Sequence, residues 1–214
     1  MIATLHDDAV QGLHLHDIPW ATYETILRDL EGQHYRITFD RGDLEIMTIS
    51  HEHEYYGELL GRLIHMLTLV LNIPIHSGGS TTFRRAMSEK GLEPDKCFWI
   101  QNELGMRGKR TFDIDVDPPP DLALEVEISR SALDRMGIYA ALRVPEVWCS
   151  DGESLRVFHL GKNGKYRKKD RSLAFPTLPV QELMRFLHAS ETTDETTLMR
   201  SFSEWVAATL MPKK

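Results

Sequence analysis

The segment from Asp121 to Ser129 alternates between apolar and polar or small side chains, and this pattern constrains the fold most strongly. One set of alternate residues is apolar: Leu122, Leu124, Val126 and Ile128. The other set is polar or small: Asp121, Ala123, Glu125, Glu127 and Ser129. Successive side chains of a strand point to opposite faces, so the segment predicts a strand with one core face and one acidic face.

The other segments predict helices and strands in an irregular order. Helical spacing of apolar residues predicts helices at residues 19–30, 52–71, 131–142, 180–189 and 194–210. Short alternating or apolar runs predict strands at residues 35–39, 44–48, 73–87, 95–100, 144–149 and 154–160. This order disfavours a doubly wound nucleotide fold. We expect an α/β (or α+β) domain, in which a mixed β-sheet is flanked by helices.

The helix expected from Glu52 to Leu71 carries a broad apolar face, which is typical of a core helix. Its apolar face matches that of the strand, so the two should pack together. We therefore expect a shared core that buries Leu63, Leu67, Leu124 and Val126.

Length and charge limit the class of protein. The 214 residues suit one domain, with residues 1–18 as a loosely attached lead-in and 19–214 as the domain, C-terminal helices included. A formal net charge of −7 excludes coating of nucleic acid through general basicity, but not an acidic nuclease that uses a metal ion. No membrane span or signal peptide is recognisable, so we expect a cytoplasmic protein.

Two carboxylates on the acidic strand face could serve a metal ion. The Cα atoms of Glu125 and Glu127 should lie roughly 6 to 7 Å apart, so both side chains can approach one hard cation. Asp121 is too distant along the strand to join them easily. Asp95 follows Pro94 at the start of another strand and is the natural further donor. The alternative is an ordinary solvent-exposed strand face, where acids are common.

Other motifs are weaker. His14 and His16 flank one leucine and could bind a metal, but the sequence suggests no third ligand nearby. The histidines at positions 51 and 53 do not form H-E-x-x-H, which excludes a zinc protease. Two cysteines are too few for a disulfide scaffold or a four-cysteine zinc site.

Five segments resemble a known family in the right order. They are Leu44–Met47, Glu52–Glu54, Glu93–Asp95, Pro119–Glu125 and Ile138–Trp148. Together they resemble the Uma family of predicted endonucleases, which is similar in fold to type II restriction enzymes, the PD-(D/E)XK superfamily. The resemblance implies a DNA phosphodiesterase that depends on Mg²⁺ or Mn²⁺.

The resemblance also assigns residues to the superfamily motif. Pro94 and Asp95 match its "PD", and Glu125 matches the acid of "(D/E)XK". The lysine of that motif would fall at position 127, where this chain has Glu127. A glutamate of the first core helix often joins the metal site in the superfamily, and Glu54 or Glu52 is its counterpart.

Relatives in the Uma family carry a lysine in the helix that follows, four residues before the position of Tyr139. This chain has Arg135 there. An arginine stays protonated at any working pH, so it cannot act as a general base, although it can stabilise developing negative charge. Both usual positions of the lysine are therefore changed.

Several functions remain open at this stage. The first is an endonuclease whose metal is held by carboxylates, with Arg135 as an electrostatic partner; the expected metal ligands are Asp95, Glu125, Glu127 and Glu54. The second is a catalytically degenerate nuclease fold that acts as a DNA-binding or protein-interaction module. A structural protein without a ligand is the third.

A homodimer is also expected, because restriction-type folds often pair to cut both strands of DNA. Three apolar residues of the C-terminal helices look exposed in the sequence: Phe202, Trp205 and Met211.

Overall fold

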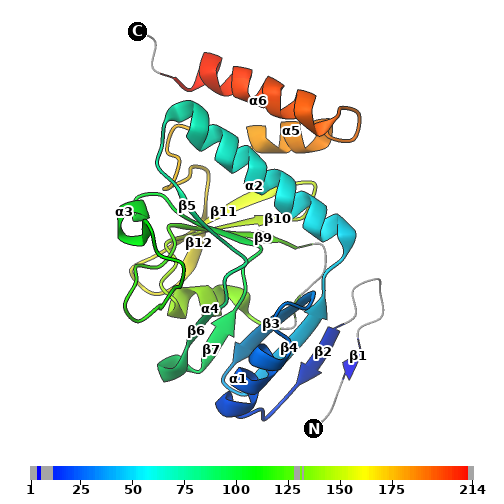
Figure 1. Ribbon diagram of the computed structural model, residues 1–214, viewed down its shortest axis with the longest axis vertical. Coiled ribbons are helices and arrows are strands. Elements are labelled where there is room, and N and C mark those ends of the chain that lie inside the picture. The colour runs from blue at the N-terminus through cyan, green and yellow to red at the C-terminus, as the bar shows by residue number, and fades with distance from the viewer. Residues whose placement is uncertain (1–3, 6–11, 128–130, 132, 212–214) are drawn as a thin grey trace.

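The computed structural model describes residues 4–5, 12–127, 131 and 133–211, and these form six α-helices and two six-stranded sheets (Figure 1). The helices are α1 (Trp20–Asp29), α2 (His51–Leu71), α3 (Glu103–Met106), α4 (Arg135–Ala141), α5 (Glu182–Ala189) and α6 (Glu195–Thr209). The N-terminal sheet has the order β1 (Thr4–Leu5), β2 (Gly12–Leu15), β4 (Asp43–Thr48), β3 (Tyr35–Asp40), β7 (Lys90–Leu92), β6 (Phe83–Arg85). The central sheet has the order β12 (Tyr166–Lys169), β11 (Leu155–Leu160), β10 (Glu146–Ser150), β9 (Leu122–Val126), β8 (Lys96–Trp99), β5 (His76–Gly79). The expected mixture of sheet and helices is confirmed.

The hairpin of β3 and β4 forms because its two strands alternate apolar and polar residues around a tight turn. Residues 41 and 42 both have positive φ angles, 48° for Arg41 and 97° for Gly42. Such a turn matches the right-handed twist of the two strands, and glycine adopts this backbone conformation without strain. The antiparallel register pairs Phe39 with Leu44 and Thr38 with Glu45.

Helix α2 follows the hairpin directly and forms one wall of the central core. Its first turn is capped by Ser50, whose hydroxyl accepts a hydrogen bond from the backbone N–H of His53 at 3.2 Å. Its last turn ends at Asn72, which adopts the left-handed conformation that closes helices. Figure 1 shows α2 lying across the central sheet, with α5 and α6 packed on its outer side.

The shared core predicted for α2 and β9 is confirmed. One apolar cluster contains all four expected residues, each at most 2% exposed: Leu63, Leu67, Leu124 and Val126. The other face of β9 is buried as well, because Ala123 belongs to a second cluster that includes Ile138 and Tyr139 of α4. The interpretation of the acidic face as an ordinary solvent-exposed surface is therefore wrong for Glu125, which is 3% exposed.

The structure differs from the sequence expectation in how the strands are divided. Two sheets occur where one was expected, and the segment 73–87 contributes β5 to one sheet and β6 to the other. Gly79 has a positive φ angle of 58°, which ends β5 and lets the chain turn towards the N-terminal sheet. The predicted strand positions Ile128 and Ser129 lie outside the described residues.

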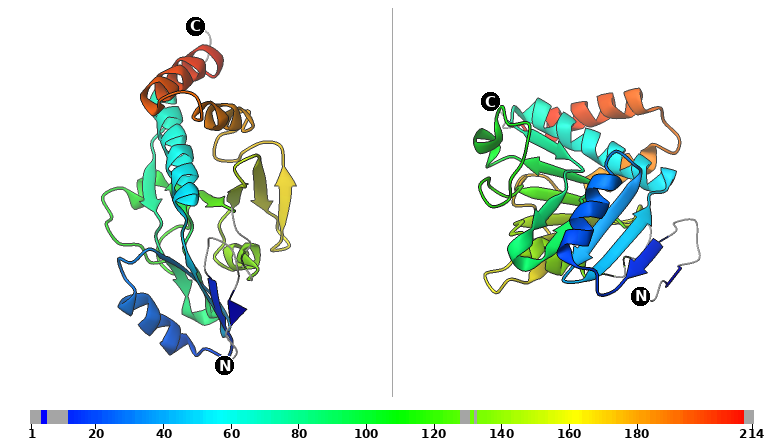
Figure 2. Two further views of the ribbon diagram at one scale, coloured as in Figure 1. Left: turned by 90° about the vertical axis from the view of Figure 1, so that its right-hand side faces the viewer. Right: turned by 60° about the horizontal axis from the view of Figure 1, so that its bottom comes forward.

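The two ends of the chain also differ from expectation. Residues 12–15 are not loose, because they form β2, which pairs with β4 on one side and with the short edge strand β1 on the other (Figure 2). Phe202 is fully buried against Phe186 and Trp205, whereas Met211 is 47% exposed. The expectation that Phe202 is exposed is wrong, because α6 turns its aromatic face towards α2 and α5. None of the helices in the described ranges is long and apolar enough to cross a membrane.

Candidate functional site

Asp95 is fixed at the point where the chain enters the central sheet. Its backbone N–H donates to the carbonyl of Leu124 at 3.1 Å, and the N–H of Val126 donates to its Oδ2 at 2.6 Å. These two bonds attach the residue to β9, the strand that carries Glu125. The antiparallel pairing of β8 with β9 thus places Asp95 beside the acidic face.

Glu125 lies in the middle of the molecule, under α4. Its Oε1 accepts hydrogen bonds from the guanidinium of Arg135 at 2.6 Å and from the hydroxyl of Tyr139. Arg135 and Tyr139 are four residues apart on α4, so both reach down from the same helix face. Helix α4 therefore holds one oxygen of Glu125 in a defined position.

Arg36 brings the two carboxylates together. It extends from β3 of the N-terminal sheet, where its Nη2 forms an ion pair with Oδ1 of Asp95. Its Nη1 lies 3.6 Å from Oε2 of Glu125. Asp95 and Glu125, hereafter the acidic pair, thus converge on a single positive charge although they come from different strands.

Arg135 also spans the two sheets. Its Nη1 donates to the hydroxyl of Thr38 on β3 at 2.7 Å, and its Nη2 donates to the carbonyl of Glu93 at 2.8 Å. Burial alone would lower the pKa of Arg135, but the charge of Glu125 and the hydrogen bonds to Glu125 and Tyr139 together raise it. Arg135 therefore stays charged and cannot serve as a general base.

Arg36 has the opposite balance. Burial lowers the pKa of its guanidinium, although the charge of Glu125 acts to raise it. An arginine pKa starts so high that the group still carries its proton at neutral pH. Two carboxylates and two guanidinium groups therefore compensate each other in the interior, which is the arrangement that buried charges require.

His53 lies beside Asp95 at the start of α2. Its Nε2 is 3.2 Å from Oδ2 of Asp95, yet neither ring nitrogen has a hydrogen-bond partner among the described residues. Burial and the positive charge of Arg36 lower the pKa of His53 to about 4. The imidazole is therefore neutral at pH 7, and its unpaired nitrogens are free to bind a ligand.

The two remaining expected site residues do not join the acidic pair. Glu127 follows the last residue of β9 and forms an ion pair at 2.5 Å with Arg156 on β11, where its side chain is 45% exposed. Its expected convergence with Asp95 and Glu125 is therefore not found. Glu54 is exposed and lines the same cleft as Asp95, without a contact to the acidic pair among the described residues.

A cleft of about 1120 Å³ opens in front of the acidic pair. Its walls come from α1, the start of β3, the start of α2 and the segments around residues 80–84, 93–96 and 112–114. Its floor includes Arg36, His53 and Asp95. Four positively charged side chains line the cleft: Arg28, Arg36, Arg84 and Lys96. Six acidic side chains line it as well: Glu24, Glu31, Glu54, Glu93, Asp95 and Asp113. Cations and carboxylates are therefore mixed in the cleft, and Glu125 is not among the residues that line it.

Three residues of this site escaped the sequence analysis. Arg36 and Thr38 alternate with apolar residues on a hairpin strand, a pattern typical of a solvated face, and His53 lies in a motif that fits no zinc protease. The hairpin's alternation showed that its polar residues share a face, but nothing local showed that this face is covered by α4. Tyr139 marked a family motif, and its contact with Glu125 depends on how α4 packs.

The chain matches the model of a protein family and resembles a solved structure. A family described as "Uma2: Putative restriction endonuclease" matches residues 20–190. A crystal structure described as "a putative nuclease belonging to DUF820", from Anabaena variabilis, has a TM-score of 0.48 and 10% sequence identity, and the match covers 85% of this chain and 98% of that chain. No match was found among curated proteins.

Proposed function

This chain belongs to the Uma2 family of restriction-endonuclease-like proteins, and from that membership we propose that it is a DNA endonuclease built around the acidic pair. The observation that carries the proposal is the convergence of Asp95 and Glu125 on Arg36, which lines an open cleft together with Asp95. Two carboxylates this close are suited to phosphodiester chemistry when they hold a divalent metal ion. A homodimer and a cytoplasmic location remain predictions.

The expected Mg²⁺ or Mn²⁺ fits the chemistry of this donor set. The acidic pair already shares a positive charge, so the guanidinium of Arg36 stands where a divalent cation would neutralise the carboxylates. His53 adds a neutral imidazole with unpaired nitrogens beside Asp95. Asp95 and Glu125 would hold the cation, which would polarise the scissile phosphate and lower the pKa of a bound water.

The residues of the chain itself have separable roles in this proposal. Arg135 and Tyr139 are positioning residues, because they hold Glu125 ionised and fixed in orientation. Arg36 lines the cleft, so on leaving the acidic pair its planar guanidinium can contact a phosphate through two parallel hydrogen bonds. His53 is neutral at pH 7, because burial and Arg36 lower its pKa to about 4, so it can accept a hydrogen bond from a water molecule or ligand but is a weak general base.

A second function, the catalytically degenerate fold, is favoured by a specific observation. The acidic pair is already neutralised by Arg36 and Arg135, and a divalent cation must displace one arginine to bind. Glu127, which stands in place of a lysine, pairs with Arg156 instead of joining the site. A protein of this kind would bind DNA in the cleft without cutting it.

Incubation with supercoiled plasmid at several concentrations of Mg²⁺ and Mn²⁺ separates the two functions. For an endonuclease we expect nicked or linear product from the wild type and a loss of about 100-fold or more in Glu125→Gln, since a metal ligand contributes several kcal/mol to the transition state. Glu204→Gln, which changes an exposed acid of α6, is the matched control and should cleave like the wild type.

A gel-shift measurement with the same DNA completes the test. Retarded DNA without cleavage at any metal concentration would reject the endonuclease and support the degenerate fold. An absence of both cleavage and retardation would reject the endonuclease and also DNA binding by the degenerate fold. Asp95→Asn provides an independent second variant of the acidic pair, and circular dichroism checks that each variant is folded.

A further inference from the structure

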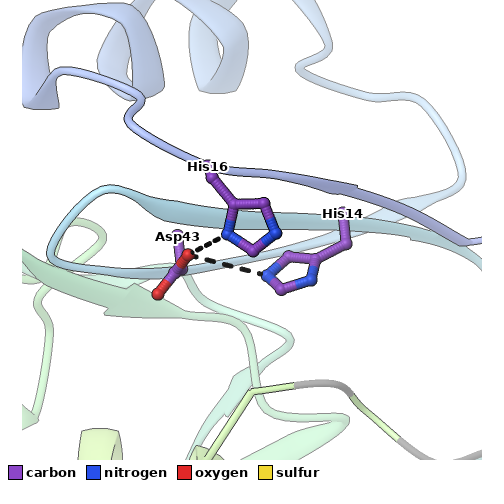
Figure 3. Close-up of side chains that lie close together, drawn as sticks. All are labelled: His14, His16 and Asp43. Atoms are coloured by element: carbon purple, nitrogen blue, oxygen red, sulfur yellow. Dashed lines mark hydrogen bonds and ion pairs between the residues drawn. The ribbon is translucent and has the colours of Figure 1, made fainter. Parts of the chain in front are cut away.

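A second group of metal-type side chains lies near one edge of the N-terminal sheet, and it shares no residue with the acidic pair. It consists of His14, His16 and Asp43, hereafter the histidine cluster (Figure 3). The antiparallel pairing of β2 with β4 sets Leu15 opposite Leu44, so His16 comes to lie beside Asp43. His14 and His16 are two residues apart, and their rings extend from the same side of the chain towards Asp43.

The geometry of the histidine cluster suits one shared ion. Nδ1 of His16 is hydrogen-bonded to Oδ1 of Asp43 at 2.6 Å, a contact that a bound ion would replace, and Nε2 of His14 lies 3.9 Å from the same oxygen. The three potential ligand atoms all lie within 4.8 Å of one another. Zinc–nitrogen and zinc–oxygen bonds are about 2.0 to 2.2 Å long, so small side-chain rotations bring all three atoms to one ion.

One polar atom of the histidine cluster has no other explanation in the fold. Nε2 of His14 is buried and has no hydrogen-bond partner within the described ranges. A buried polar nitrogen without a partner is unfavourable, and most such atoms in proteins are paired. The atom is directed at Asp43 but lies beyond hydrogen-bond distance, which leaves space for an ion between them.

We propose that the histidine cluster binds a divalent transition-metal ion, and that Zn²⁺ is the ion it prefers. Two imidazole nitrogens and one carboxylate oxygen form a donor set that suits zinc and related transition metals, whereas Mg²⁺ prefers oxygen ligands alone. The side chains of His16 and Asp43 are 48% and 45% exposed, so the fourth position of the ion faces solvent and takes a water molecule.

Binding at the histidine cluster fastens the N-terminal strand to the rest of the protein. Its two imidazoles come from β2 and the residue after it, and its carboxylate comes from β4. His14 and His16 precede the residues 20–190 that match the Uma2 family, whereas Asp43 lies within them, so the complete residue set is not contained in that match. The metal would join β2 to β4, next to the short edge strand β1 of the N-terminal sheet.

Isothermal titration of the metal-stripped full chain with ZnCl₂ tests the proposal. We expect the wild type to bind with a dissociation constant of 10 μM or tighter (an order-of-magnitude figure) and to show a rise in Tm of about 5 °C at saturating Zn²⁺. The variants His14→Gln and His16→Gln should each weaken this binding at least about tenfold. The matched control is His188→Gln, a partly exposed histidine of α5, which should bind like the wild type.

The same titration distinguishes this site from the acidic pair. Glu125→Gln should keep the zinc binding, because Glu125 is not part of the histidine cluster. Failure of the wild type to bind Zn²⁺ at about 100 μM (an order-of-magnitude figure) overturns the proposal, as does binding that survives in both histidine variants. Should His14→Gln fail to fold, His16→Gln and Asp43→Asn change partly exposed side chains and still decide the question.

Discussion

The acidic pair and the histidine cluster both contain potential metal ligands, but they differ in burial and in the charged residues they contact. The acidic pair is buried, and Arg36 and Arg135 already supply its positive charges. The histidine cluster is partly exposed, and one of its ring nitrogens has no partner within the described part of the chain. The carboxylates of the acidic pair already contact arginines of the protein, whereas the histidine cluster contacts no arginine or lysine among the described residues and is accessible from solvent.

This difference follows from the free energy of burying charge. A carboxylate removed from water must be neutralised or hydrogen-bonded, and the fold supplies both through arginines that reach the acidic pair from β3 and α4. His16 and Asp43 keep contact with water, so the fold does not have to supply a cation for Asp43, whose side chain contacts the two histidines. Whether a group of potential metal ligands can bind a metal ion therefore depends on how buried the group is and on which residues it already contacts.

The largest effect should come from removing the cation that the acidic pair shares. Arg36→Met leaves two buried carboxylates with one guanidinium, so the free energy of unfolding in metal-free buffer should fall by about 3 to 5 kcal/mol. Urea unfolding measures this change. Arg28→Met, an arginine of the same cleft with a 71% exposed side chain, is the control and should stay within about 0.5 kcal/mol.

Mn²⁺ should restore part of the stability of the Arg36→Met chain and have less effect on the wild type, where the guanidinium competes with the metal. A loss below about 1 kcal/mol in Arg36→Met would contradict the description of the acidic pair as a compensated buried site.

The loss of stability on truncating the apolar face of β9 can be compared with the loss on removing Arg36 at its charged face. Leu124→Ala leaves a cavity between β9 and α2, so stability should fall by about 2 to 5 kcal/mol. Leu69→Ala, at a leucine of α2 that is 74% exposed, serves as the control. If Leu124→Ala lost less than about 0.5 kcal/mol, the packing of α2 on β9 would be in error.

A smaller loss should follow from removing the hydroxyl that receives a hydrogen bond from Arg135. Thr38→Val keeps the shape of a fully buried residue but leaves Nη1 of Arg135 without its acceptor. The free energy of unfolding should fall by about 1 to 3 kcal/mol. Thr192→Val, on the loop between α5 and α6, is the control; equal losses in the two variants would remove the role of Thr38.

The smallest effect should come from the histidine cluster in the absence of metal. Asp43→Asn breaks a partly exposed contact with His16, so stability in EDTA should change by less than about 1 kcal/mol. Thermal unfolding with and without EDTA measures it. A loss above about 2 kcal/mol without metal would show that the cluster is a structural ion pair and would remove its contrast with the acidic pair.

Most of the local structure could be predicted from the sequence. The helix at His51–Leu71 and the hairpin at Tyr35–Thr48 follow from apolar periodicity, which depends on residues close together in the chain. The helix that contains Tyr139 is predicted from residue 131 but begins at Arg135, where the side chain of Asp134 caps it by accepting a hydrogen bond from the backbone N–H of Gly137. Boundaries of this kind depend on single hydrogen bonds that periodicity does not encode.

The sequence alone determined which residues share a strand or a helix face and which family motifs the chain carries. It placed Asp95 and Glu125 on candidate strands, but their approach to each other depends on the pairing of β8 with β9. The tertiary structure alone decided that Arg36 lies between them and that Glu127 does not join them. It also decided that Asp43 meets the two histidines. The physical reason is that strand pairing and the packing of helices over sheets bring together residues whose chain separation carries no local signal.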